Sequence, residues 1–118
     1  MAKTRVRIDG RYLSQAATQP ATPASGDPVL VGQIPGVALT AERADGTTSI
    51  DTAGVYNLTV KGETNADAGS AVAIGDLIFY DAADTPVLNK DTTGVRFGYA
   101  LATLGSGVTG VIPVKVGY

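Results

Sequence analysis

Glycine, proline and Asp-Gly turn signals separate the apolar residues of this chain into short runs, and this spacing restricts the chain to a β-rich fold. The runs are rich in Val, Ile and aromatic residues and are bounded by Gly-Asp-Pro, Pro-Gly, Asp-Gly, Ala-Gly and Gly-Ser-Gly. Such runs between turn signals predict strands. We expect strands at 12–17, 29–31, 34–40, 47–51, 55–61, 76–81, 87–89, 96–103 and 111–116. The one helix-compatible segment, 65–73, contains Gly69 and Ser70 and is expected to form a turn or two at most.

Side chains alternate along the run 55–60, with Val55, Asn57 and Thr59 on one face and Tyr56, Leu58 and Val60 on the other. This pattern is typical of a half-buried antiparallel strand. With 118 residues the chain has the size of a single domain. We therefore expect an all-β fold, a small antiparallel β-barrel or compact β-sandwich with an extended N-terminal arm. The predicted division is an arm with an Ala/Thr/Pro strap over 1–24 and a barrel-like domain over 25–118.

Charge is distributed unevenly. The first eleven residues contain four basic side chains and one acidic one, Asp9, which gives a net charge of +3. The remaining residues contain five basic and ten acidic side chains, a net charge of −5, so the whole chain has a net charge of −2. In an extended conformation Lys3, Arg5 and Arg7 point one way, and Thr4, Val6 and Ile8 the other. This alternation favours an arm that binds another surface, and a frayed, solubilising terminus is the alternative.

Two segments repeat faintly. Gly26-Asp-Pro-Val-Leu-Val31 is similar to Gly75-Asp-Leu-Ile-Phe-Tyr80, and each precedes a glycine-containing run, Gly36-Val-Ala-Leu39 or Gly98-Tyr-Ala-Leu101. The repeat indicates either two pseudo-symmetric units or one tight turn used twice. We favour the second interpretation.

The residue types that several kinds of functional site require are missing from this sequence. The chain has no Cys and no His, which removes disulfides, thiolate metal sites and histidine triads. The glycine-rich loop 105–110 is not followed by Lys, so it is not a phosphate-binding loop. No apolar run approaches the roughly 20 residues of a membrane span, and no secretory signal is expected. Because the body is acidic and its basic residues are scattered, nucleic acid is a poor partner. We expect no cofactor, metal or membrane partner.

The acidic residues Asp81 and Asp84, with Asp76 nearby, are the best candidates for catalysis. Asp-rich turns commonly cap backbone amides, and we prefer this interpretation. The segment 81–91 does not fit a calcium-binding loop, although a weak surface calcium site stays open. An enzyme acting through Asp81 and Asp84 would be eliminated if the two carboxylates were solvated and splayed apart.

Several motifs together resemble those of the phage capsid cement, or head decoration, family. They are Ser25-Gly-Asp-Pro-Val-Leu-Val-Gly32, Pro35-Gly-Val-Ala38, Val72-Ala-Ile-Gly-Asp-Leu-Ile-Phe-Tyr-Asp81 and Phe97-Gly-Tyr-Ala-Leu101, followed by an ending of alternating Val and Lys. The opening Met-Ala-Lys is also typical. The resemblance runs from about residue 25 to the C-terminus, and the longer strap over 18–23 departs from shorter members. Some relatives have been labelled RecA/RadA-like recombinases, which this chain does not support because it lacks the ATP-binding loop.

The resemblance implies a non-enzymatic protein, often trimeric, on the outer surface of an icosahedral tailed-phage head. It would cement adjacent subunits of the major capsid protein and stabilise the head. We expect the arm to bind the capsid through Lys3, Arg5, Val6, Arg7, Ile8 and Arg11. The alternative is a glycan- or cell-surface-binding β module of a phage tail or adhesion assembly, which requires exposed aromatic residues. Tyr56, Tyr80 and Tyr99 are expected in the core instead.

Overall fold

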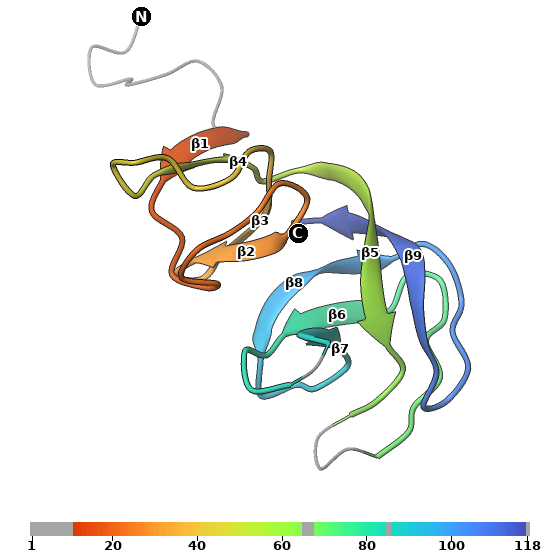
Figure 1. Cartoon of the computed structure of the whole chain (residues 1–118). Coiled ribbons are helices and arrows are strands. Elements are labelled where there is room, and N and C mark those ends of the chain that lie inside the picture. Colours follow the sequence, from red (N-terminus) through yellow and green to blue (C-terminus); the bar gives the residue numbers. More distant parts are fainter. Residues whose placement is uncertain (1–10, 65–67, 85, 118) are drawn as a thin grey trace, which may run out of the picture.

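The computed structural model describes residues 11–64, 68–84 and 86–117. This part of the chain folds into nine strands and no helix (Figure 1), which confirms the all-β class. It therefore contains no helix that could cross a membrane. The strands are β1 (Tyr12–Gln15), β2 (Pro28–Val31), β3 (Ile34–Ala38), β4 (Thr48–Asp51), β5 (Gly54–Lys61), β6 (Leu77–Tyr80), β7 (Leu88–Asn89), β8 (Val95–Ala100) and β9 (Thr109–Val116).

Each expected run coincides with one strand, but the ends differ. β3 and β8 end earlier than their apolar runs, at Ala38 and Ala100, because the glycine turns described below begin there. β9 begins earlier than expected, at Thr109. In the segment 65–73, where a turn or two of helix was the upper limit, residues 65–67 lie outside the described part. The remainder makes isolated bridges, Glu63 with Gly69 and Val72 with Leu104.

The strands form two antiparallel sheets. The first has the order β1-β4-β3-β2, and the second has the order β5-β9-β8-β6-β7. The second sheet curls into a half-barrel, while the first lies beside it at the end where the chain enters (Figure 1). The alternation predicted for β5 is confirmed, because Tyr56, Leu58 and Val60 face the interior and Val55, Asn57 and Thr59 are exposed.

The two sheets share the larger of two apolar cores. Leu30 and Val37 of the first sheet pack in one cluster with residues of the second, including Phe97. The rings of Tyr80 and Phe97 stack with centroids 6.3 Å apart, so Tyr80 is a core residue as predicted. Apolar area shared in this way stabilises the sheets as one unit.

Tyr99 corrects the sequence prediction, because it is only half-buried and lies on the outer face of the half-barrel. Arg96 Nη2 donates to its hydroxyl at 2.9 Å, and Lys115 Nζ lies 5.9 Å from the centre of its ring. Tyr56 packs against the core but is also only half-buried, since its hydroxyl group reaches Asp51. A phenol can bury its ring while its hydroxyl keeps a polar partner, which the alternation of the sequence does not reveal.

The two echoed segments form the same turn with the same hydrogen bonds. Gly26 N–H donates to Ala38 C=O at 2.7 Å, and Ala38 N–H donates to Asp27 C=O at 2.9 Å. In the second copy Gly75, Ala100 and Asp76 make the same two bonds at 2.7 and 2.9 Å. The glycines have φ of 88° and 90°, a region that side chains rarely adopt.

A third copy of this turn occurs without a sequence echo. Gly107 N–H donates to Gly62 C=O at 2.7 Å, and Gly62 N–H donates to Val108 C=O at 3.0 Å. Each copy leads into a strand, β2, β6 or β9, that pairs with the strand ending at the turn, β3, β8 or β5. The same turn therefore occurs three times in the described part of the chain.

Candidate interaction surfaces

Arg11 holds the base of the predicted arm against the junction of the two sheets. Its Nε and Nη2 atoms donate to Oδ1 and Oδ2 of Asp51 at 2.7 and 2.9 Å, a bidentate pair. The Arg11 C=O accepts hydrogen bonds from Thr52, from the backbone N–H at 2.9 Å and from Oγ1 at 2.6 Å. Thr52 lies between β4 and β5, which belong to different sheets. Arg11 is thereby held at the point where the chain passes from one sheet to the other.

Asp51 is the centre of this cluster, and its side chain is only 2% exposed. The hydroxyl of Tyr56 and the N–H of Ala53 donate to the same carboxylate. Burial disfavours the charged form of Asp51, but the hydrogen bonds from Arg11, Tyr56 and Ala53 together outweigh it and lower its pKa. The bond with Asp51 correspondingly raises the pKa of Arg11. The carboxylate therefore stays ionised although it is buried.

Of the six residues predicted to bind a capsid, only Arg11 lies in the described part of the chain. Its side chain is 42% exposed while paired with Asp51, so its outer surface stays accessible. The guanidinium also lies 4.9 Å from the centre of the Tyr12 ring. The other five, Lys3, Arg5, Val6, Arg7 and Ile8, lie outside the described residues, and their role stays a prediction. Nothing in the sequence near Arg11 indicates Asp51 as its partner, because the two residues are forty positions apart.

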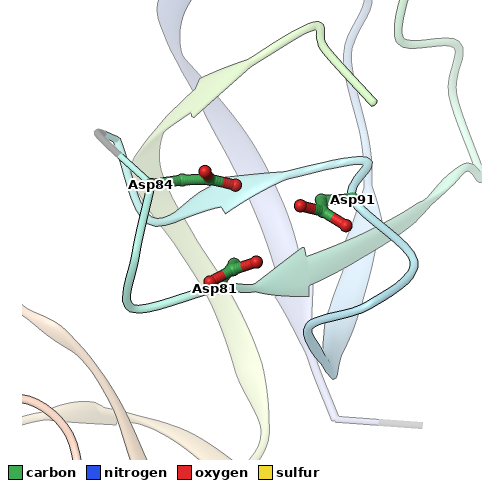
Figure 2. Close-up of side chains that lie close together, drawn as sticks. All are labelled: Asp81, Asp84 and Asp91. Atoms are coloured by element: carbon green, nitrogen blue, oxygen red, sulfur yellow. The ribbon is translucent and has the colours of Figure 1, made fainter. Parts of the chain in front are cut away.

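Three carboxylates converge beside β7 (Figure 2). They belong to Asp81, Asp84 and Asp91, and one oxygen from each lies within 4.8 Å of the other two. The sequence singled out Asp76 as the neighbour of Asp81 and Asp84, but Asp76 instead pairs with Lys90 Nζ at 3.1 Å. Asp91 takes its place because the loop after β7 folds back as a turn, in which Thr93 N–H donates to Asp91 Oδ1 at 2.9 Å.

The carboxylates of Asp81 and Asp84 lie close together and are not splayed apart. Their positions therefore do not eliminate an acid–base pair. Burial raises the pKa of Asp84, and the negative charges of Asp81, Asp91 and Glu63 add to the effect, whereas the hydrogen bond from Asn89 Nδ2 opposes it. The pKa of Asp91 is lowered by its bonds from Thr93. The three oxygens are chemically suited to a hard divalent cation. Nothing beyond the carboxylates themselves points to an ion.

Neither a catalytic cleft nor an aromatic platform accompanies these acids in the part of the chain that the structure describes. No pocket opens there. Tyr12 is 46% exposed, whereas Tyr80 is buried and Tyr56 and Tyr99 are half-buried on different faces. The described tyrosines therefore do not form the exposed platform that the glycan-binding alternative requires.

A small all-β protein with no pocket among its described residues has the form of a structural or binding protein. Residues 9–116 match the family model of the phage cement protein. The chain therefore belongs to the phage cement protein family, and its role is a structural one in the phage capsid. No curated protein and no solved structure matches it.

Proposed function

We propose that this protein binds the outer surface of the phage head as a homotrimer and cements adjacent subunits of the major capsid protein. Membership of the cement family is the observation that carries the proposal. A cement protein acts by adding contact area across joints, so that separating two shell subunits also requires breaking its contacts. Three copies in one trimer multiply modest contacts through effective concentration.

The arm is the first contact in this proposal. Lys3, Arg5 and Arg7 would face an acidic or polar strip of the shell, and Val6 and Ile8 would face an apolar one. The arrangement at Arg11 supports this role, because two residues anchored to the body, Arg11 and Tyr12, hold the point from which the arm departs. A fixed base reduces the conformational entropy that an arm loses on binding.

Co-sedimentation with undecorated heads tests the proposal. Deleting residues 2–8 removes the predicted contacts but keeps Arg11, so that Asp51 is not left unpaired. We expect the deletion to weaken head binding by at least about tenfold and to reduce its salt dependence. The melting temperature should stay near that of the parent, because the deletion leaves the Arg11–Asp51 pair in place.

The matched control is Lys3→Gln/Arg5→Gln/Arg7→Gln, which keeps the length of the arm and its apolar positions. It should lose salt dependence and keep part of the affinity. Analytical ultracentrifugation measures the oligomeric mass of each variant. If the deletion and the parent bind heads equally at all salt concentrations, the arm has no part in binding; if the parent does not bind heads at all, the proposed function is wrong.

A further inference from the structure

The outer edge of β5 has backbone groups without partners. The turn bond from Gly62 N–H to Val108 C=O shows which residues of β5 bond to β9, because it joins directly opposite residues at the end of this ladder. In an antiparallel pair every second residue makes such bonds, so the even-numbered residues of β5 face β9. The N–H and C=O groups of Val55, Asn57 and Thr59 therefore point away from the sheet. Among the described residues nothing bonds to them.

The neighbouring strands confirm this assignment. In β9 the odd-numbered positions bond to β8, since Gly117 N–H donates to Phe97 C=O at 3.0 Å and Leu101 N–H donates to Pro113 C=O at 2.9 Å. The even-numbered positions of β9 are then left for β5, which is consistent with Gly62 and Val108. The β5–β9 register has no shift along its length.

The other sheet edges are short or covered. β2 is covered by the strap, because Thr18 and Gln19 N–H both donate to Leu30 C=O and Leu30 N–H donates to Gln19 C=O at 2.8 Å. β7 has two residues and β1 has four. β5 has eight, contains no proline or bulge, and carries its single charge at its last position, Lys61. Proteins normally protect a long edge of this kind, because it readily pairs with another strand.

The half-barrel closes only beyond the end of β5. There Lys90 N–H donates to Glu63 C=O at 2.9 Å, which joins the segment after β7 to the segment after β5. In Figure 1 β7 lies near the tip of β5, and the opposite end of β5 runs free of it. Among the described residues, no strand pairs with the stretch from Val55 to Thr59 on this side.

We infer that this edge of β5 is a strand-addition site that takes an extended segment of the shell protein. The inference rests on the proposed function and specifies which part of this chain the shell contacts. Main-chain hydrogen bonds to Val55, Asn57 and Thr59 would supply affinity. The outer face beside the new strand carries Lys61 and Lys115 and no carboxylate in β5 or β9. Lys61 Nζ pairs with Glu63 Oε2, just beyond β5, at 3.0 Å, so Lys115 is the charge that bears on the incoming segment. The incoming segment is therefore one with neutral or acidic side chains on its outer face.

Other occupants fit less well. The arm of a second copy would place Lys3, Arg5 and Arg7 or their apolar neighbours beside the face that carries Lys115, and like charges across strands are destabilising. A second copy pairing through its own β5 would create a twofold interface, which a cyclic trimer does not contain. Both are outcomes that the experiment separates from the inferred one.

Asn57→Pro is the sharpest test, because the Asn57 N–H faces outward and makes no bond within the sheet. Proline removes that donor and places its ring at the edge, which edge strands tolerate. We expect the variant to keep its oligomeric mass, to melt within a few degrees of the parent, and to bind undecorated heads at least about tenfold more weakly. Asn57→Ala is the matched control, since it changes the side chain and keeps the N–H, and it should bind like the parent.

Hydrogen exchange read by mass spectrometry provides a second measurement that needs no variant. Peptides covering β5 should gain protection when the parent binds heads, and this gain should appear only in the complex. The even-numbered N–H groups of β5 are already protected in the free protein because they bond to β9, so the informative amides are those of Val55, Asn57 and Thr59. Protection of these three amides in the free protein would show that a second copy occupies the edge and would overturn the inference. So would an Asn57→Pro variant that folds and binds heads as the parent does. If peptides from the arm gain protection and peptides from β5 do not, the inference fails while the proposed function survives. If the parent protein does not bind heads at all, the proposed function itself fails.

Discussion

Asp51, at the end of β4, is paired with Arg11, forty positions earlier, by two hydrogen bonds of 2.7 and 2.9 Å. This pair links the start of the first sheet to the passage into the second, since Tyr12 lies opposite Asp51 in the β1–β4 register. Because the carboxylate is buried and accepts four hydrogen bonds, its replacement affects both sheets.

Asp51→Asn should lower the free energy of unfolding by about 2 kcal/mol at neutral pH, because the amide cannot accept all the donors that Asp51 satisfies. The pKa of Asp51 is lowered in the folded state, so its contribution is complete above the unfolded pKa of about 3.9 and is lost as pH falls through the folded pKa. The difference between variant and parent should therefore shrink below about pH 4. Urea unfolding between pH 3 and pH 8 measures it.

Arg11→Gln provides the control for this pair. Combined with Asp51→Asn it should cost little more than Asp51→Asn alone, because the two residues act through one interaction. Additive losses would contradict the view that the Arg11–Asp51 contact is the reason for the effect.

Local patterns predicted the strands of this protein, and long-range pairing limited what they could predict. The alternation from Val55 to Val60 is a property of neighbouring residues, so the orientation of β5 follows from the sequence. The pairing of β1 with β4 does not, because nothing near Tyr12 specifies Asp51 as its partner. The open edge of β5 was likewise hidden, since it depends on the order of strands in the sheet.

The acidic cluster of Asp81, Asp84 and Asp91 was also only partly predictable from the sequence. Asp81 and Asp84 are close in sequence, and their association was foreseeable. Whether Asp76 or Asp91 joins them depends on how β7 returns toward β6 and on the position of Lys90, which attracts Asp76. Spacing alone does not carry this information.

Gly98 of β8 lies opposite Val116 of β9 and close to the backbone of Lys115. A Cβ atom there would collide with the carbonyl oxygen of Lys115 and lie 3.0 Å from its carbon, both in the backbone. Gly98→Ala should therefore destabilise the protein by about 1–3 kcal/mol, because the strands must move apart. Chemical unfolding measures the change. Gly105→Ala is the control, since its Cβ would meet only the exposed side chain of Val108, at 3.1 Å, and no backbone atom; a comparable loss there would refute the explanation.

Asp84→Asn should stabilise the protein at neutral pH, by less than about 1 kcal/mol because the residue is half-buried. Burial and the neighbouring negative charges raise the pKa of Asp84 in the folded state. The folded protein therefore holds this proton more tightly than the unfolded chain, and its stability falls as pH rises from the unfolded pKa through the folded one. The asparagine removes that loss, so the two proteins should melt alike near pH 3 and differ near pH 7. Equal melting temperatures across the range would contradict the prediction.

The repeated turn allows one interaction to be compared in two surroundings. Asp27 Oδ2 accepts from Ala24 N–H at 2.9 Å, and Asp76 Oδ2 accepts from Ala73 N–H at the same distance. Asp76 also binds Lys90 Nζ at 3.1 Å, and its pKa is lowered by the Ala73 bond and then by Lys90.

Asp27→Ala should therefore cost about 1 kcal/mol, the usual worth of one such bond, and Asp76→Ala should cost somewhat more. Lys90→Met tests the source of the difference. In that background Asp76→Ala should cost no more than Asp27→Ala does in the parent, and both are measured by urea unfolding at pH 7. If the larger loss at Asp76 persists without the lysine, the extra stability comes from the packing of this second turn against the half-barrel rather than from the ion pair.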